Sequence, residues 1–301
     1  MSVKAVEVCI VGGGPAGLSA ALVLGRCRRS VVVFDSGQPR NSASRALHAY
    51  LTRDGTPPLD LRRMGRDELR AYPSVEVVED EVATIRRQVD RFTLETRNGR
   101  EVTSRFLLLA TGRVDVLPEV SRAKEFYGRG LYHCPYCDGW EHRDGRLAVT
   151  GSGAVDLALE LLTWSDRVLL CPDEDAPLDE PALAHLRQRG VAIAPAPVAG
   201  LSGPAGGSLE QLTLKNGDEV PCDALFFCSE CRQRSPFGEL LGCSFDDAGS
   251  VKCTGHAATG VPGLYVAGNV RGGLHLAIMA AAEGAEAAVA INEAILDQDV
   301  A

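Results

Sequence analysis

The fold is decided by the stretch VEVCIVGGGPAGLSAALVL, which occupies residues 6–24. Its first part, Val6–Val11, is largely apolar and predicts a buried strand. Gly12, Gly14 and Gly17 follow in the spacing G-x-G-x-x-G, and the apolar residues after them predict a helix. The glycines let backbone N–H groups approach a pyrophosphate at the N-terminus of that helix.

A second short strand strengthens this interpretation. Residues 31–34 are apolar, and Asp35 follows them, about twenty residues after the glycines. An acid in that position can hold ribose hydroxyls. Strand, glycine loop, helix, strand and acid in this order predict a dinucleotide-binding unit, whereas an isolated glycine motif would be a weak signal.

The composition sets limits on the function. At 301 residues the chain has room for two nucleotide-binding domains, and 45% hydrophobic and 24% charged residues are ordinary for a globular protein. A net charge of −9 argues against nucleic acid and anionic membranes as partners. Residues 5–25 are apolar, but Glu7 and the glycine loop favour structure over a signal peptide. A cytoplasmic location without a membrane anchor is expected.

The rest of the chain alternates strands and helices, which predicts an α/β protein with two Rossmann-like, three-layer domains. Leu147–Thr150 starts a second strand–loop–helix, with Gly151, Gly153 and Asp156 in the loop. We expect residues 1–113 and 234–301 to form one split domain, with 114–233 inserted. The further predicted elements are strands at 75–85, 92–96, 101–110, 167–171, 224–227 and 264–269, a turn at Asn98-Gly99, and helices to about residue 164 and at 276–296.

A pair of cysteines lies just before the second glycine loop. Cys134 and Cys137 form a Cys-x-x-Cys that runs directly into Asp138. In the cytosol a close pair is catalytic or metal-binding before it is structural. The attacking sulfur must be a thiolate, and a helix N-terminus lowers a cysteine pKa, while Pro135 stiffens the first turn. The sequence therefore predicts a dithiol that exchanges electrons with thiols.

Taken together, these motifs resemble the low-molecular-weight thioredoxin reductase-like flavoproteins over essentially the whole chain. The resemblance implies a homodimer, FAD in the split domain, and a redox Cys-x-x-Cys in the inserted one. It implies that Cys134 attacks the substrate, that Cys137 lies against the flavin and that Asp138 is the acid–base group. The cofactor contacts that it implies are Gly12, Gly14, Pro15, Ala16, Gly17, Asp35, Ser36, Arg40, Asn41, Ala110, Thr111, Gly112, Gly268, Asn269, Leu276 and Ala277.

The chain departs from the reductase pattern where NADPH would bind. Residues 167–171 run into Pro172-Asp-Glu-Asp175 instead of an Arg-rich segment, and carboxylates there repel a 2′-phosphate. Asp156 takes the place of a small residue that packs helix against strand, and it competes with a pyrophosphate for the helix N-terminus. The alternative is NADH, because an acid after that strand can bind ribose hydroxyls.

Without a nicotinamide donor the reaction can run toward oxidation of a substrate dithiol. The run Cys-Pro-Tyr-Cys-Asp-Gly-Trp-Glu resembles the dithiol oxidases of secondary metabolism, of the gliotoxin and holomycin type and of the bicyclic depsipeptide type. In the first group the residue after the second cysteine is usually His, so the base here is Asp138 or a histidine. Of His48, His133, His142 and His275, we favour His275, which follows the Gly268-Asn269 turn.

A second Cys-x-x-Cys, Cys228-Ser-Glu-Cys231, follows the predicted strand at 224–227. Ten cysteines in a chain of this length make one such pair by chance plausible on composition alone. Three interpretations remain open: small residues closing a strand, a second redox pair, or zinc shared with the first pair. The gap of roughly 90 residues argues against zinc, so no metal is expected.

These features predict an FAD-dependent dithiol oxidase. Its substrate would be a small-molecule dithiol, closed to an intramolecular disulfide, with molecular oxygen reduced to hydrogen peroxide. The rivals are a disulfide reductase supplied by NAD(P)H or ferredoxin, and a flavin-binding regulatory or scaffold protein.

Overall fold

The computed structural model describes residues 4–174, 177–228 and 230–300. Within it the chain forms two compact units. The first comprises residues 1–42, 50–114 and 232–301, and the second comprises residues 43–49 and 115–231. Each unit is built around its own sheet, so each is described by itself.

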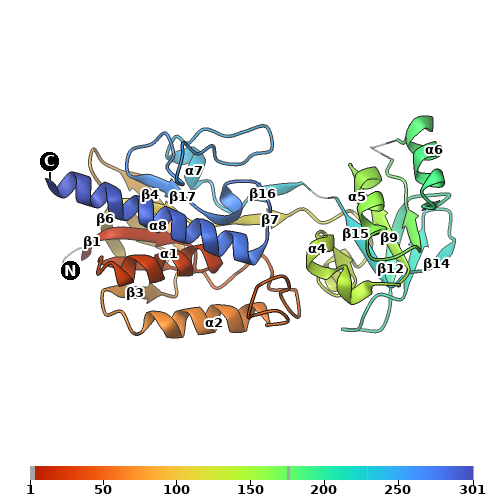
Figure 1. Cartoon of the computed structure of the whole chain (residues 1–301), viewed down its shortest axis with the longest axis horizontal. Helices are drawn as coiled ribbons and strands as arrows, with labels where there is room; N and C mark the ends of the chain where they lie inside the picture. The colour runs from red at the N-terminus through yellow and green to blue at the C-terminus, as the bar shows by residue number, and fades with distance from the viewer. Residues whose placement is uncertain (1–3, 175–176, 229, 301) are drawn as a thin grey trace. The chain divides into compact units, whose positions relative to one another are not determined.

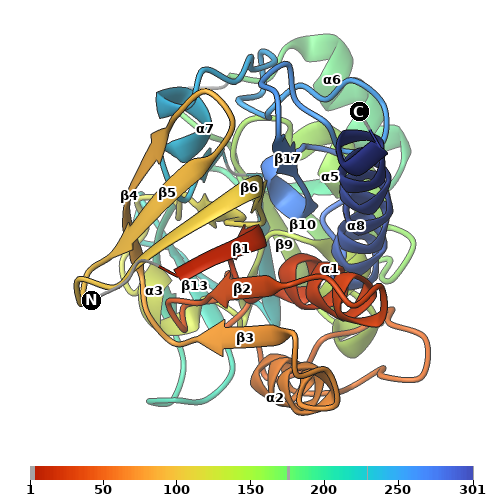
Figure 2. The same cartoon turned by 90° about the vertical axis from the view of Figure 1, so that its left-hand side faces the viewer.

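The first unit contains a sheet in the order β3-β2-β1-β6-β5-β4, with β17 beside β6 (Figures 1 and 2). Strands β1, β2, β3, β6 and β17 pair in parallel, whereas β4 and β5 are antiparallel. The side chains of β2 are buried throughout, as the uninterrupted apolar run predicts for a covered parallel sheet. The strands are β1 (Lys4–Val11), β2 (Val31–Phe34), β3 (Val75–Val78), β4 (Val82–Arg87), β5 (Phe92–Thr96), β6 (Glu101–Leu109) and β17 (Leu264–Val266).

Helices α1 (Pro15–Arg26) and α8 (Ala277–Val300) lie side by side on the sheet (Figures 1 and 2). Their contact is too close for side chains at one position, because a Cβ on Gly284 would stand 2.0 Å from the carbonyl oxygen of Ala16. The unit also holds α2 (Pro58–Leu69), α7 (Phe237–Leu240) and the 3-10 turn η2 (Gly268–Val270).

The second unit contains a parallel sheet in the order β11-β10-β9-β15-β8, and β12, β13 and β14 form a separate antiparallel sheet. The parallel strands are β8 (Leu131–Tyr132), β9 (Leu147–Thr150), β10 (Val168–Leu170), β11 (Ala192–Ile193) and β15 (Ala224–Phe227). The antiparallel strands are β12 (Val198–Ser202), β13 (Gln211–Leu214) and β14 (Glu219–Pro221). The helices are α3 (Ala123–Phe126), α4 (Pro135–Asp138), η1 (Trp140–His142), α5 (Ala154–Leu161) and α6 (Glu180–Gln188).

The chain passes between the units along β7 (Arg113–Asp115) and β16 (Cys231–Gln233), which pair as a two-stranded ribbon. A third connection is the segment 43–49, which packs with the second unit although its neighbours in sequence belong to the first. Two observations show this packing. Arg45 donates to the carbonyl oxygen of Gly206 at 3.1 Å. The carbonyl oxygen of Ala43 lies so close to Gly128 that a Cβ added to that glycine would stand 2.6 Å from it.

The predicted α/β fold class is confirmed, and the strands at 31–34, 147–150 and 224–227 have the predicted bounds. The single strand expected at 75–85 is wrong, because a turn around Asp80 divides it into β3 and β4 on opposite edges of the sheet. The turn at Asn98-Gly99 joins β5 to β6, and Gly99 has the positive φ of 79° that favours glycine. Among the described residues, no helix is both long and apolar enough to cross a bilayer.

Candidate active site and flavin cradle

Cys134 and Cys137 form a disulfide at the start of α4, with their Cα atoms 5.3 Å apart. Cys134 is the N-cap of the helix in an extended backbone conformation, and Pro135 occupies its first turn. The N–H groups of Cys137 and Asp138 both donate to the carbonyl oxygen of Cys134, at 3.2 and 3.3 Å. The chain therefore tightens into helix directly behind the first sulfur, which places both sulfurs at the positive end of the helix.

Asp138 closes this short helix and is only partly exposed. Burial raises the pKa of its carboxyl group to about 7, the negative charge of Glu141 pushes it in the same direction, and His48 opposes both. A carboxyl group with a pKa near neutrality exchanges a proton readily at physiological pH, which suits an acid–base group beside a thiol.

Two histidines near the disulfide are held by aromatic neighbours. The Nε2 atom of His142 lies 3.1 Å from the hydroxyl of Tyr132, and burial lowers the pKa of this imidazole. The Nδ1 atom of His133 lies 3.3 Å from the hydroxyl of Tyr127. Both rings belong to clusters that pack against β15, so their surroundings explain them as structural side chains.

His275, the histidine favoured from the sequence, lies in the first unit immediately before α8. The guanidinium of Arg40 is 3.0 Å from its Nδ1 atom. A guanidinium only donates, so this contact requires Nδ1 to be an acceptor and the proton to sit on Nε2. The structure thus brings together two residues that were predicted separately, Arg40 as a cofactor contact and His275 as a base.

The first glycine loop has the shape that a dinucleotide needs. A Cβ on Gly12 would stand 2.2 Å from the carbonyl oxygen of Ala110, and one on Gly17 would stand 1.8 Å from that of Gly12. Apart from its neighbours in the chain, no atom of the described residues lies within 4 Å of the position of a Cβ on Gly14, the N-cap of α1. Two glycines thus close the loop, and the third leaves open the space in front of the helix where a pyrophosphate binds.

Asp35 is buried at the end of β2 and is held from three sides. Its carboxylate accepts hydrogen bonds from Gly37 N at 2.9 Å, Arg62 Nη2 at 2.6 Å and Arg66 Nη2. Burial opposes its ionisation, but the hydrogen bonds from Arg66, Gly37 and Arg62 outweigh burial and hold the pKa of Asp35 below its usual value. A carboxylate has about four acceptor positions, so room remains for one ribose hydroxyl.

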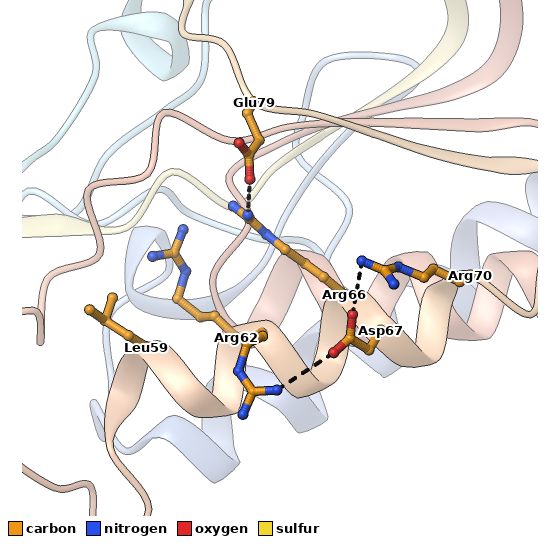
Figure 3. A pocket seen from close by; sticks show the side chains of 7 residues that line it. Leu59, Arg62, Arg66, Asp67, Arg70 and Glu79 are labelled. Atoms are coloured by element: carbon orange, nitrogen blue, oxygen red, sulfur yellow. Dashed lines mark hydrogen bonds and ion pairs between the residues drawn. The ribbon is translucent and has the colours of Figure 1, made fainter.

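Arg62 and Arg66, which bind Asp35, also line a hollow of about 380 Å³. Figure 3 shows the side chains that line it. The lining residues are Leu59, Arg62, Arg63, Arg66, Asp67, Arg70 and Glu79. Every arginine in it faces a carboxylate: Asp35, Asp60, Asp67 or Glu79. The positive charge of the hollow is therefore largely neutralised by neighbouring carboxylates, which makes it a poor site for a free phosphate.

The remaining predicted cofactor contacts come from five segments of the first unit. Gly268 has φ 73°, and its N–H donates to Glu283 at 2.8 Å, while burial raises the pKa of that glutamate. The other predicted contacts are Pro15 and Ala16 in α1, Ser36 and Asn41 after β2, Thr111 and Gly112 after β6, Asn269 in η2, and Leu276 and Ala277 at the start of α8.

The second glycine loop, between β9 and α5, differs from the first. The prediction that Asp156 lies at the contact between helix and strand is wrong. Asp156 is exposed, because α5 turns this position toward solvent. The Sγ atom of Cys228 instead lies 3.7 Å from the position of a Cβ on Gly153, the N-cap of α5. Beyond β10, Lys215 is paired with Glu174 at 2.6 Å. Asp175, the last acid of that run, lies outside the described residues.

The second cysteine pair is placed at the edge of the same loop. Cys228 follows β15 directly and Cys231 begins β16, and both are thiols. Burial raises the pKa of Cys228 to about 11, with further contributions from Asp156 and Glu160. The intervening Ser229 lies outside the described residues.

The similarity of this chain to known proteins agrees with these features of the site. Residues 6–284 match the family model "pyridine nucleotide-disulphide oxidoreductase". The chain belongs to this family. Its members are FAD-binding flavoproteins, and the open Gly14 position and the anchored Asp35 fit FAD in the first unit of this oxidoreductase.

Its relatives include a thioredoxin reductase of Claviceps purpurea, tcpT, which is 32% identical over 88% of this chain and 86% of that protein. A probable thioredoxin reductase of Arthroderma benhamiae is 37% identical, but the match spans only 54% of this chain and 42% of that protein. Among solved structures, HlmI superposes with a TM-score of 0.93 at 34% identity, covering 98% of this chain and 94% of that one.

Sequence patterns alone do not reveal Arg62, Arg66 and Glu141. The arginines lie on α2, an element without any motif, although the spacing of four residues on one amphipathic helix is a signal that two positive groups share a face. Glu141 stands three residues after Asp138, and the same helical spacing would have flagged the two carboxyl groups as neighbours.

Proposed function

We propose that this oxidoreductase is an FAD-dependent dithiol oxidase that closes a small-molecule dithiol to an intramolecular disulfide and passes the electrons to molecular oxygen, giving hydrogen peroxide. The substrate type that fits the sequence resemblance is a secondary metabolite of the bicyclic depsipeptide class. The observation that carries the proposal is the contrast between an intact disulfide on α4 and a second glycine loop whose helix α5 has Asp156 in its first turn, with Asp173 and Glu174 rather than basic residues following β10.

The residues of the second unit supply the thiol chemistry. A substrate thiolate attacks Sγ of Cys134, the bond between the two cysteines breaks, and its electron pair stays on Cys137. Asp138 takes the proton of the attacking thiol. The second substrate thiol then attacks the substrate sulfur of the mixed disulfide, the bond to Sγ of Cys134 breaks with its electron pair on Cys134, and Cys134 takes up the proton of that thiol; the cyclic product is released and both cysteines are reduced. Bound FAD supplies the two-electron acceptor that restores the disulfide.

The direction of this exchange depends on reduction potentials, because thiol–disulfide exchange is reversible and 30 mV corresponds to about 1.4 kcal/mol for two electrons. A steady supply of NADPH would drive it toward disulfide reduction. Asp156 in the first turn of α5 disfavours the pyrophosphate of that donor, and the acids that replace basic residues after β10 disfavour its 2′-phosphate, so oxygen leaves oxidation as the direction of net flux.

Exposed aromatic side chains beside the disulfide suit an apolar small molecule. Tyr136, between the two cysteines, is 57% exposed, and Trp140 is 64% exposed. Both are held in place: Tyr136 packs edge-on against Trp164 with ring centroids 5.6 Å apart, and the guanidinium of Arg143 lies 4.3 Å above the ring of Trp140. Rigid aromatic surface binds apolar ligands at a low cost in conformational entropy.

The second candidate is a disulfide reductase supplied by NAD(P)H or ferredoxin, acting on a thioredoxin-like protein. Its support is that the curated relatives tcpT of Claviceps purpurea and sirT of Leptosphaeria maculans carry the name thioredoxin reductase. We propose a homodimer for either function.

One experiment separates the two candidates. The purified FAD-loaded protein is mixed with dithiothreitol without any nicotinamide, and oxygen uptake and the visible flavin band are recorded. The protein is then mixed anaerobically with NADPH or NADH alone. Oxygen uptake with the dithiol, and a flavin band unchanged by nicotinamide, is the expected result. Rapid bleaching by NADPH or NADH would establish the reductase instead.

A further inference from the structure

His48 reaches the redox helix from a distant part of the sequence. It lies in segment 43–49, which packs with the second unit through the contacts of Arg45 and Ala43 described above. Its Nε2 atom is 3.5 Å from Oε1 of Glu141, and its side chain is 21% exposed. A histidine about 90 residues away from Asp138 in sequence thus belongs to the same cluster of titratable groups.

Glu141 connects this histidine to the acid of the Cys-x-x-Cys-Asp motif. Glu141 lies three residues after Asp138, and the backbone hydrogen bonds Gly139 N to Pro135 O and His142 N to Gly139 O continue the helical turn between them. Side chains three apart on a helical turn are neighbours. The negative charge of Glu141 and the imidazole of His48 therefore act on Asp138 in opposite directions.

The other groups around Asp138 are limited in what they can do at neutral pH. Tyr132 on β8 interacts with Asp138, and burial raises the pKa of its hydroxyl above its ordinary value, so it stays neutral. His142 is bound to that hydroxyl, and burial disfavours its charged form. Arg45, on the same segment as His48, acts on Tyr132 and opposes the effect of burial on its pKa.

We propose that His48, paired with Glu141, is a positioning residue that governs whether Asp138 holds a proton during thiol–disulfide exchange. This inference rests on the proposed role of Asp138 in the exchange. His48 lies against Glu141 and opposes its effect on Asp138, which favours the carboxylate, the form that accepts the proton of an attacking thiol. Without His48, burial and Glu141 act on Asp138 unopposed, and the carboxyl group holds its proton to higher pH.

The step that is controlled is balanced in atoms and electrons. A thiol and the Cys134–Cys137 disulfide give a mixed disulfide at Cys134 and a thiolate at Cys137, and the proton of the thiol moves to the Asp138 carboxylate. No external oxidant or reductant enters this step. It is common to an oxidase and a reductase, so it can be measured whichever direction the enzyme runs in.

The test measures how the rate of exchange depends on pH. FAD-loaded protein is mixed anaerobically with dithiothreitol between pH 5.5 and 8.5, quenched in acid, and the thiols formed at Cys134 and Cys137 are counted by alkylation and mass spectrometry. His48→Gln should move the midpoint of the profile up by about half a pH unit or more, which roughly halves the rate at pH 7. Glu141→Gln should move the midpoint down by a similar amount.

Two further variants serve as controls. In Asp138→Asn the rate of exchange should depend on pH only through ionisation of the dithiothreitol thiol. Its pH–rate profile should therefore lack the change near pH 7. His256→Gln removes a comparable contact in the first unit, where His256 Nδ1 lies 3.7 Å from Glu286 Oε1, and it should leave the midpoint unchanged.

Opposite displacements in the two variants would establish the inference, because a merely structural lesion lowers the rate without moving the midpoint in opposite senses. Midpoints that stay in place, or move in the same direction, would overturn it. Failure of the proposed function appears elsewhere, as absent oxygen uptake and rapid bleaching by nicotinamide.

Discussion

Asp35 and Arg62 form a buried ion pair beneath the first glycine loop. The Nη2 atom of Arg62 is 2.6 Å from Oδ2 of Asp35, and the two side chains are 8% and 6% exposed. The Nε atom of Arg62 also donates to the carbonyl oxygen of Gly13 at 3.2 Å. One arginine on α2 thus fixes both the acid that is predicted to hold the ribose and the glycine loop that is predicted to hold the pyrophosphate.

Replacing Arg62 by Met should destabilise the protein. The variant leaves Asp35 buried with one of its cations missing, and breaking a buried pair in this way costs about 3–5 kcal/mol. Urea unfolding at pH 7 measures the loss. Arg63→Met is the control, because Arg63 lies on the same helix with its side chain 64% exposed and should change the free energy of unfolding by less than about 1 kcal/mol. Equal losses in both variants would contradict the role given to the buried pair.

The stabilisation from Asp35 should also depend on pH. Because the pKa of Asp35 is lowered in the folded protein, its contribution is present above the ordinary pKa of an aspartate and is lost as the pH falls through the lowered value. The difference in unfolding free energy between the wild-type protein and Arg62→Met should therefore shrink as the pH falls from 5 toward 2. A difference that stays constant over this range would show that Asp35 does not titrate with the pair.

Two glycines of the first loop should respond differently to alanine. Gly17→Ala places a Cβ 1.8 Å from a backbone oxygen and should cost about 3 kcal/mol or more. Gly14→Ala meets no protein atom within 4 Å at φ −82°, so the apoprotein should keep its melting temperature, while FAD retention on gel filtration falls. Unaltered FAD content in Gly14→Ala would mean that the pyrophosphate does not approach this position.

Cys134→Ser should abolish turnover with a dithiol and leave FAD bound. The serine cannot accept the attacking sulfur, whereas the residues predicted to contact FAD all lie in the first unit. Oxygen uptake and the visible spectrum report the two properties separately. Cys27→Ser, which changes an exposed cysteine of the first unit, should retain full activity. Full activity in Cys134→Ser would exclude the proposed mechanism.

Cys228 should be a slow nucleophile. With a pKa of about 11, roughly one thiol in ten thousand is ionised at pH 7. Iodoacetamide at pH 7 should therefore label Cys27 well before Cys228, and mass spectrometry of the peptides gives both rates. For Cys228→Ser we expect a partial loss of dithiol turnover if the second pair relays electrons. An unchanged rate would favour the simpler interpretation, in which the cysteines only close the strand.

Local pattern was enough to predict the elements that carry the fold. The glycine spacing and the apolar runs identified β1, β2, β9 and β15, because a buried parallel strand needs an uninterrupted apolar sequence. The same reasoning failed at residues 75–85, where alternation continues through a turn and hides the division into two strands. It also overlooked α2, whose mean composition is strongly polar even though Arg62 and Leu69 are buried.

The candidate site, like the fold, could be predicted only in part from the sequence. Cys134, Cys137 and Asp138 are adjacent in sequence, so their motif could be read directly. The groups that modulate them come from elsewhere: His48 reaches Glu141 across more than ninety positions, and no periodicity encodes such a contact. The preference for His275 over the other histidines followed a family analogy, whereas the structure pairs that ring with Arg40.

The packing of segment 43–49 has a consequence for dissecting the molecule. A gene fragment encoding residues 115–231 would carry the disulfide and the carboxyl groups of Asp138 and Glu141, yet it would lack segment 43–49, which contains His48. An excised module would therefore need those seven residues grafted through a designed linker or added as a synthetic peptide. If such a peptide restored the pH profile of thiol–disulfide exchange, a segment that is covalently part of the enzyme would act as a separate ligand, whose concentration could be varied.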